Sequence, residues 1–324
     1  MAAKAAAAAI VTQNGEVMKH HPRPSTIVWP ALRRLCSCLA LAAFCGNAGN
    51  ALAQVSVTDD LGREVTLAAP ARRIIALYGG FDEILSSMDL TSLLVARTRN
   101  VDDAMPPELA QLPAIGTHLR PNLEMIAALA PDLVLQMGGR DDVAQGVEAL
   151  ARLHIPVVVL DIKNFEELFS AIARIGELTG HADAAELLTR DMRAKLAAVG
   201  EPGGDRRPTV YYEVREQSPI GAGRGSFVSD VIRLAGGDNA LASDEKFVRL
   251  SEETVLAADP DVYLVQRGPM NQDPSDPKDR PRLAGLRAVK TGRVYFVDEK
   301  TYSRPGPQSV DAVADLAGKL RGAQ

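Results

Sequence analysis

Short apolar runs alternate with helical patterns along most of this 324-residue chain, and this alternation constrains the fold more than any other feature. The first such runs lie at residues 74–77, 93–96, 133–137 and 157–160. Runs of this length separated by helical patterns predict the buried strands of a largely parallel sheet with helices on both faces. The sequence therefore predicts the α/β class.

The same alternation resumes after a long helical stretch. Residues 165–199 are helical in pattern almost throughout, with a break at Gly180, and residues 200–208 are rich in glycine, proline and charge. We then expect strands at 209–214 and 293–297, a helix at 227–234 and a last helix from about residue 308. The chain is therefore predicted to hold two α/β lobes, at 54–162 and 204–324, joined by a helical segment at 163–203. A short hairpin with a Asp-Asp-Leu-Gly turn is expected before the first sheet strand.

One pattern occurs twice, 129 residues apart: a helix, a Pro-Asp pair and an apolar strand. The pairs are residues 131–132 and 260–261, and Glu124 corresponds to Glu253. A Pro-Asp turn is common between a helix and a strand, but the shared spacing favours duplication or a shared architecture of the two lobes. Asn122 and Ser251 are good N-caps, so both glutamates would be second in their helices, where the helix dipole favours negative charge.

The first 53 residues have the pattern of a secretory signal peptide. Arg33 and Arg34 precede an apolar run that is too short to span a bilayer, and small residues end it before Gln54. We predict cleavage after Ala53 and a mature protein outside the cytoplasm. A lipid anchor is not favoured, because Phe44 precedes Cys45 where a small residue would be needed. Residues before Met18 resemble an upstream extension.

Composition and motifs exclude several function classes. The formal net charge is −5, and removal of the basic first 53 residues makes the remainder more acidic, which is unfavourable for binding nucleic acid. All three cysteines lie before residue 54, and His118, His154 and His181 are scattered, so we predict neither a disulfide nor a resident metal site. No phosphate loop, dinucleotide loop or nucleophile motif is present. We therefore predict no catalytic residue and no cofactor.

Arginines follow strand after strand of both predicted lobes. Ligands of open α/β sheets bind outside the carboxyl ends of the strands, so these side chains are expected to border a ligand cleft between the lobes. Guanidinium groups suit a ligand with carboxylate or phosphate oxygens, and tyrosines and a phenylalanine beside them would supply flat apolar contacts. The predicted arginines are Arg97, Arg99, Arg140, Arg215, Arg267 and Arg304. The predicted aromatic residues are Tyr78, Phe81, Tyr212 and Tyr302.

Five segments together resemble the periplasmic substrate-binding proteins of metal-chelate ABC importers, which receive iron-siderophores, haem and cobalamin. They are "DDLGREVTLAAPARRIIAL", "IGTHLRPNLEMIAALAPDLVL", "SFVSDVIRLAGGDNAL", "LSEETVLAADPDVYLV" and "RPGPQSVDAVADLA". The resemblance covers nearly all of the chain from Gln54. It implies two Rossmann-like lobes bridged by a long α-helix, with the ligand between them, in a periplasmic protein that is not an enzyme.

The resemblance also implies partners. A glutamate on each lobe would dock on arginines of the permease, and the matching residues are Glu124 and Glu253. We expect a monomer that binds an iron(III)-siderophore type of chelate, with cobalamin or haem as alternatives, and delivers it to the permease and its ATPase. His118 is added to the ligand contacts because it and Tyr78 could reach a metal. An enzyme or sensory module on the same fold is the alternative from another class.

Overall fold

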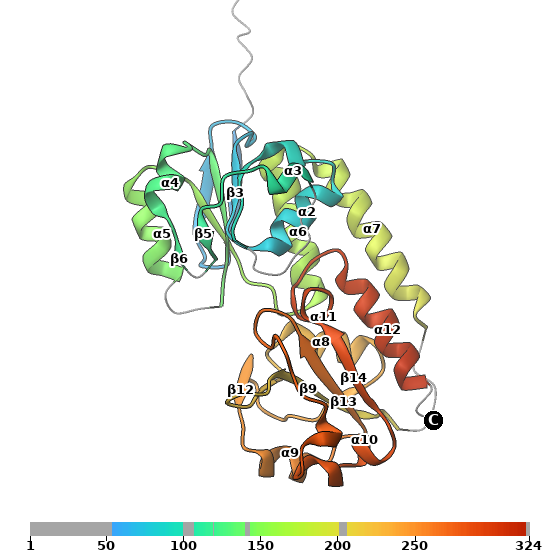
Figure 1. The fold of residues 1–324 in the computed structure, drawn as a ribbon. Helices are drawn as coiled ribbons and strands as arrows, with labels where there is room; N and C mark the ends of the chain where they lie inside the picture. Colours follow the sequence, from blue (N-terminus) through green and yellow to red (C-terminus); the bar gives the residue numbers. More distant parts are fainter. Residues whose placement is uncertain (1–53, 100–106, 119, 140–142, 201–205, 322–324) are drawn as a thin grey trace, which may run out of the picture. The chain divides into compact units, whose positions relative to one another are not determined.

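The first sheet contains four parallel strands in the order β4-β3-β7-β8. They are β3 (Ile74–Ala76), β4 (Leu94–Ala96), β7 (Leu133–Met137) and β8 (Val157–Leu160). The computed structural model describes residues 54–99, 107–118, 120–139, 143–200 and 206–321 (Figure 1). The predicted signal peptide therefore lies outside the described residues. All four predicted strands of this half are confirmed, and β7 and β8 have the predicted bounds.

Helices cover both faces of this sheet, as the apolar runs predict. Helices α2 (Gly79–Ser87) and α6 (Phe165–Thr179) lie on one face, and α4 (Leu123–Ala128) and α5 (Val143–Arg152) on the other (Figure 1). Neighbouring residues of β3 separate the two faces, because Ile74 packs with the α2 and α6 side chains and Ile75 with those of α4 and α5.

The second sheet repeats the strand order of the first. Its parallel strands follow the order β11-β9-β13-β14, in which the first strand in sequence again lies between the second and the third. They are β9 (Thr209–Arg215), β11 (Asp238–Asn239), β13 (Val262–Arg267) and β14 (Val294–Asp298). In such a sheet the chain turns to opposite sides beside the first strand, and ligands bind at that point. Each sheet therefore has one such point, between β3 and β7 and between β9 and β13.

Two antiparallel strands at the edge of the second sheet were not predicted. They are β10 (Ile220–Ala222), which pairs with β9, and β12 (Phe247–Arg249), which pairs with β10. Each has only three residues, and β10 lies in the glycine-rich sequence before helix α8 (Phe227–Leu234). Packing of Gly223 against the carbonyl of Glu245 leaves no room for a side chain, since an added Cβ would lie 2.2 Å from that oxygen. These glycines therefore allow two chain segments to pack closely against each other.

The remaining elements complete the two layers. Helices α8 and α12 (Ser309–Arg321) pack with one face of the second sheet, and α9 (Glu252–Ala258) and α10 (Arg287–Lys290) with the other. The short elements are η1 (Thr91–Leu93), α3 (Pro107–Ala110), β5 (Gly116–Thr117), β6 (Arg120–Pro121), η2 (Pro277–Asp279), η3 (Leu283–Gly285) and α11 (Glu299–Ser303). Both sheets belong to one compact unit, Leu52–Gln324.

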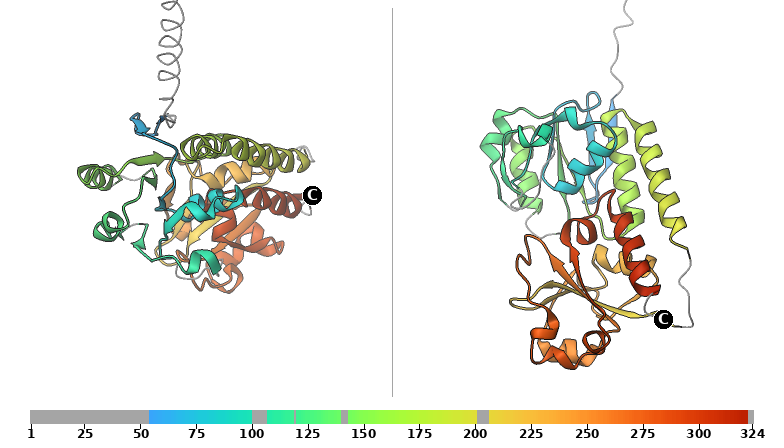
Figure 2. Two further views of the ribbon diagram at one scale, coloured as in Figure 1. Left: turned by 90° about the horizontal axis from the view of Figure 1, so that it is seen from above. Right: turned by 45° about the vertical axis from the view of Figure 1, so that its right-hand side comes forward.

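The segment between the sheets consists of two helices, α6 and α7 (Ala182–Ala198), which lie side by side (Figure 2). Gly180 ends α6 with a left-handed backbone (φ 72°), which confirms the predicted break. At its start, α6 is held by the second half of the chain, because the Phe165 N–H donates to the Asp230 carboxylate of α8 (2.9 Å). The Phe165 and Phe227 rings pack there at 5.0 Å. Helix α6 therefore contacts both sheets' layers.

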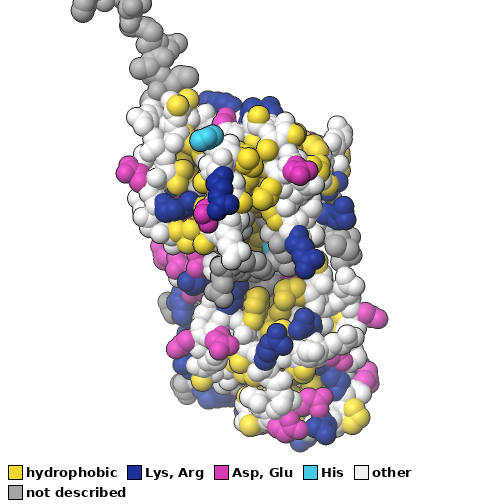
Figure 3. All heavy atoms as spheres, turned by 90° about the vertical axis from the view of Figure 1, so that its left-hand side faces the viewer, with side chains coloured by type: hydrophobic (Ala, Val, Ile, Leu, Met, Phe, Trp, Pro, Cys, Tyr) yellow, Lys and Arg dark blue, Asp and Glu magenta, His cyan; other side chains and the backbone are white. Residues whose placement is uncertain are grey.

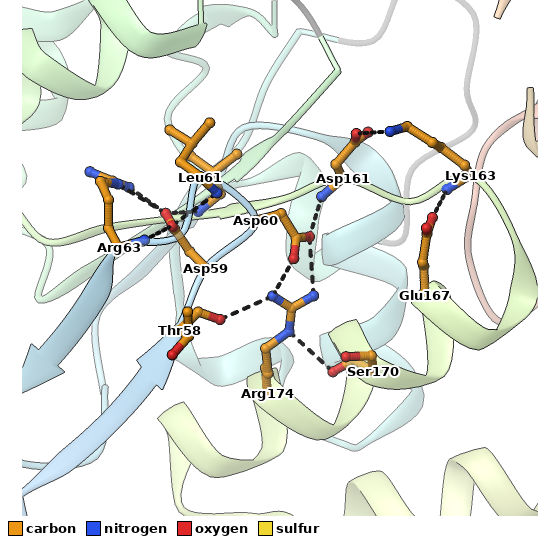
Figure 4. Close-up of polar contacts among 11 residues, drawn as sticks. Thr58, Asp59, Asp60, Leu61, Arg63, Asp161, Lys163, Glu167, Ser170 and Arg174 are labelled. Atoms are coloured by element: carbon orange, nitrogen blue, oxygen red, sulfur yellow. Dashed lines mark hydrogen bonds and ion pairs between the residues drawn. The ribbon is translucent and has the colours of Figure 1, made fainter. Parts of the chain in front are cut away.

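The predicted hairpin is confirmed as β1 (Val55–Thr58) and β2 (Glu64–Leu67), and its turn fixes the other half of α6. In this turn, Asp60 accepts two hydrogen bonds from the Arg174 guanidinium of α6, at 2.7 and 3.1 Å (Figure 4). It also accepts one from the Asp161 N–H just after β8, at 2.6 Å. The turn therefore joins the last strand of the first sheet to α6.

Candidate functional site

Tyr78 lies at the predicted ligand end of the first sheet, two residues after β3. It is the N-cap residue of α2, and its ring makes edge-to-face contacts with those of Phe81 and His118, with ring centroids 5.8 and 6.1 Å apart. Burial raises the pKa of the Tyr78 phenol, so it stays neutral and can donate a hydrogen bond. His118 is exposed at its loop. The structure therefore brings together two of the predicted ligand residues, Tyr78 and His118.

Two arginines, one after a strand of each sheet, have a buried nitrogen without a partner among the described residues. These atoms are Nε of Arg97, just after β4, and Nε of Arg215, at the end of β9. The Arg97 backbone is fixed by hydrogen bonds with Pro113 and Ile115, at 3.1 and 3.0 Å. A buried donor without an acceptor costs free energy, which an oxyanion of a ligand could recover.

The other predicted arginines have different surroundings. Arg99 is exposed, and Arg267 is exposed with its guanidinium 4.0 Å above the Phe296 ring. Arg304 is half-buried and lies 3.4 Å from the Glu83 carboxylate, so its charge is already partly balanced. Arg140 lies outside the described residues. Figure 3 shows basic and hydrophobic side chains bordering a hollow that crosses the middle of one face.

Three of the aromatic residues predicted to contact the ligand have side chains that are buried in the hydrophobic core. Phe81 and Tyr212 have no exposed surface, and Tyr302 is 3% exposed. The Tyr302 hydroxyl donates to Asp315, and the Tyr212 hydroxyl to Gln266 (3.0 Å). Almost no surface of these side chains is left for a ligand. Their positions near strand ends did not show which face of the sheet they occupy.

A polar network at the end of β13 was missed. Gln266 is fully buried, and its amide donates to Glu299 (2.9 Å) and to the Val214 carbonyl (3.3 Å) while its oxygen accepts from Ser303 (3.0 Å). The network therefore links β9, β13 and α11 at the carboxyl edge of the second sheet. The available signal was a glutamine inside the otherwise apolar strand "VYLVQR".

The two repeated helix starts are as predicted. The Asn122 side chain accepts from the Met125 N–H (3.1 Å), and the Ser251 hydroxyl accepts from the Thr254 N–H (3.4 Å). Glu124 and Glu253 are consequently the second residues of α4 and α9. Both are exposed, and the Arg282 guanidinium lies 2.7 Å from Glu253. Hydrogen bonds from its own backbone and from Ser251, with Arg282 nearby, lower the pKa of Glu253.

A groove of about 410 Å³ lies elsewhere, among α6, α7 and α8. None of the predicted ligand residues lines it. Its lining residues are Asn164, Phe165, Glu166, Phe169, Arg193, Leu196, Asp230, Arg233 and Leu234. Over the described ranges, no helix is long and apolar enough to cross a membrane, and no three His, Cys, Asp or Glu side chains are grouped to hold a metal.

Comparisons with known proteins agree with this architecture. An ABC transporter substrate-binding lipoprotein of Bacillus subtilis, itself uncharacterised, is 26% identical over 82% of this chain and 85% of its own. The vitamin B12-binding protein of Vibrio cholerae is 26% identical over 79% of this chain and 91% of its own. The apo structure of the periplasmic haem-binding protein RhuT from Roseiflexus is 25% identical with a TM-score of 0.66, over 78% of this chain and 99% of that one.

The family comparison covers the two sheets and the helices between them. Residues 74–301 match the periplasmic binding protein family, from the first strand of the first sheet to α11 after the last strand of the second. The matched region contains both points at which the strand order reverses, both repeated helix-to-strand steps, and the α6–α7 pair. The chain belongs to the periplasmic binding protein family.

Proposed function

We propose that this protein is the solute-binding component of an ABC importer and takes a metal chelate with anionic oxygen groups. The observation that carries the proposal is the pair of buried Nε donors, on Arg97 just after β4 of the first sheet and on Arg215 at the end of β9 of the second. An anion supplying oxygens to both would satisfy them, and charge-assisted hydrogen bonds of this kind are the strong ones. Tyr78, His118 and Arg267 would supply further contacts.

The relatives support a chelate of this class. The B12-binding protein aligns with this chain over 91% of its own length, and the haem-binding protein shares the fold over 99% of its own. Haem carries two carboxylates, and ferric siderophores carry several oxygen donors, so both match paired arginines. Cobalamin has a single phosphate and would use fewer of them. We therefore propose a ferric siderophore or haem as ligand, with cobalamin as the alternative, taken up in the periplasm.

The ligand test uses the purified protein from Gln54 onward. Thermal unfolding and tyrosine fluorescence are measured with haemin, cyanocobalamin and a panel of ferric siderophores, since residues 54–324 contain no tryptophan. One chelate should raise the midpoint of unfolding and quench emission. Arg97→Gln and Arg215→Gln should each weaken its binding about tenfold or more. Arg190→Gln, on the exposed surface of α7, is the matched control. Absence of any response across the panel would contradict the proposal.

We further propose that Glu124 and Glu253 bind arginines of the permease. Both carboxylates are exposed and held at helix starts by N-cap residues, so they are presented to a partner without burying charge. Glu124→Lys and Glu253→Lys should abolish uptake in cells while the affinity for the chelate is unchanged. A loss of chelate affinity in these variants would instead assign the glutamates to the ligand site or to the fold.

A further inference from the structure

Asp82 is a buried acid that the proposed function does not use. It lies in α2, is 4% exposed, and its Oδ1 has no hydrogen-bond partner in the part of the chain that the structure describes. Phe81, Ile84 and Leu85 around it in α2 are fully buried. An ionised carboxylate in such a place costs far more than a protonated one. Burial therefore favours the protonated form of Asp82 in the arrangement observed.

The residue beside it makes a contact between the layers of the two sheets. Glu83 accepts from the Gln308 amide (2.7 Å) and lies 3.4 Å from the Arg304 guanidinium and 3.7 Å from the Lys300 ammonium. These three residues follow β14 of the second sheet, whereas α2 follows β3 of the first. The backbones of α2 and of the segment after α11 also lie close together. A Cβ added at Gly80 would lie 2.3 Å from the Pro305 carbonyl oxygen. We refer to these interactions as the α2–loop contact, the loop being defined as residues 300–308, which include the last four residues of α11.

Among the described residues, the charges that act on Asp82 come from α2 itself and from the loop. Among the elements beside α2, β3 and η1 have the sequences Ile-Ile-Ala and Thr-Ser-Leu and carry no ionisable group. On α2 itself Glu83 opposes ionisation, and from the loop Arg304 favours it. Burial is the largest influence and raises the pKa of Asp82 well above its usual range. Arg304, the cation that favours ionisation of Asp82, also lies 3.4 Å from Glu83, and Oδ1 of Asp82 has no hydrogen-bond partner among the described residues.

We propose that Asp82 makes the α2–loop contact depend on pH, closing it when the carboxyl is protonated and loosening it when the carboxyl ionises. An ionised Asp82 must reach water, so α2 must move. The side-chain contacts of Glu83 with the loop are weaker than the backbone hydrogen bonds that hold β3 in its sheet, so the α2–loop contact opens first. The contact is therefore strongest in mild acid. Helix α2 starts directly after Tyr78, so the same change would alter ligand affinity, a consequence that rests on the proposed function.

The linkage between protonation of Asp82 and opening of the α2–loop contact gives the expected size of the pH dependence. Between the ordinary pKa of an aspartate and the raised one, opening releases one proton, so the opening equilibrium rises about tenfold per pH unit. Amide hydrogen exchange of α2 and the loop, corrected for the intrinsic rate, measures this in the ligand-free protein. In Asp82→Asn the corrected opening should not change with pH, and Asp82→Leu gives the same result if the amide is poorly tolerated.

Glu83→Gln is the matched control, because it weakens the contact and leaves the buried acid in place. It should raise opening at every pH and leave a rise of about tenfold per pH unit. Carbon-detected NMR of the Asp82 carboxyl follows its titration directly. An ordinary pKa for Asp82, or equal pH dependence in the native protein and Asp82→Asn, would overturn the proposal. Because no ligand is present, these outcomes are independent of whether the protein binds a chelate.

Discussion

The two helix-to-strand steps, α4–β7 and α9–β13, share one backbone path but hold their aspartates differently. Residues Ala130 and Asp259, at the same place in each step, both have a positive φ, of 43° and 34°. In the first step, Asp132 is half-exposed and, among the described residues, accepts hydrogen bonds from the backbone N–H groups of Arg72 and Arg73, at 2.7 and 2.9 Å. These groups lie just before β3, so Asp132 fixes the start of the strand beside its own.

In the second step, the corresponding aspartate is buried and paired with cations. Asp261 is 3% exposed and accepts from the Thr209 N–H at the start of β9 (2.8 Å). It also accepts from the guanidinium groups of Arg206 (2.6 Å) and Arg287 (2.7 Å). Both aspartates thus connect neighbouring parallel strands, but a buried carboxylate requires compensating charge and a half-exposed one does not. Both copies of the repeat therefore use the aspartate to connect two strands, but only the buried one is paired with arginines among the described residues.

Removing the two aspartates should therefore have unequal effects on stability. Asp261→Ala removes the acceptor of the Thr209 N–H and of the Arg206 guanidinium, whereas Arg287 keeps its ion pair with Asp259. We expect a loss of about 2 kcal/mol in the free energy of unfolding. Asp132→Ala leaves two half-exposed N–H groups, and a loss of about 1 kcal/mol is expected. Urea unfolding of both variants checks this. Equal losses would show that the cations around Asp261 contribute nothing.

The second prediction concerns acid. The Arg206 guanidinium beside Asp261 holds the pKa of that carboxyl far below its usual range. Its stabilising effect is therefore complete above the ordinary aspartate pKa, near 3.9, and is lost as the pH falls below that value. The native protein should lose up to about 1.4 kcal/mol per pH unit more than Asp261→Asn in that interval. Asp132→Asn serves as the comparison, and urea unfolding between pH 2.5 and 5 measures all three.

The repeat also shows how much of the structure could be predicted. Apolar run length located strands such as β7 without error, and N-cap chemistry placed Glu124 and Glu253 in their helices, because both signals are local. Strand β10 was missed, since three residues in a glycine-rich sequence carry no periodic signal. Its partner strands lie elsewhere in the chain, at β9 and β12.

The ligand residues divide in a similar way. Parallel strands place their carboxyl ends together, so Tyr78, Arg97 and Arg215 could be assigned to that edge from the sequence. Burial could not be assigned: Phe81 and Tyr212 point to the face that α2, α6 and α8 cover, which depends on packing between distant segments. The pairing of Arg282 with Glu253 was also absent from the sequence signals, because it depends on where η3 lies against α9.

The smallest expected effect concerns that pairing, which distinguishes the two proposed docking glutamates. Arg282 contacts Glu253 and, at 3.5 Å, Glu252, whereas no ion pair of Glu124 occurs among the described residues. A permease arginine would have to displace or share Arg282 at Glu253 only. Arg282→Gln should therefore strengthen binding to the permease roughly two- to fivefold, the range expected for an exposed ion pair.

In a variant that already carries Glu253→Gln, adding Arg282→Gln should not change binding to the permease. In a variant that carries Glu124→Gln, it should. Arg190→Gln removes an equally exposed Arg–Glu pair on α7 and the same charge, so it controls for net charge. Weaker permease binding by Arg282→Gln would mean that this arginine orients Glu253 for its partner and does not compete with it.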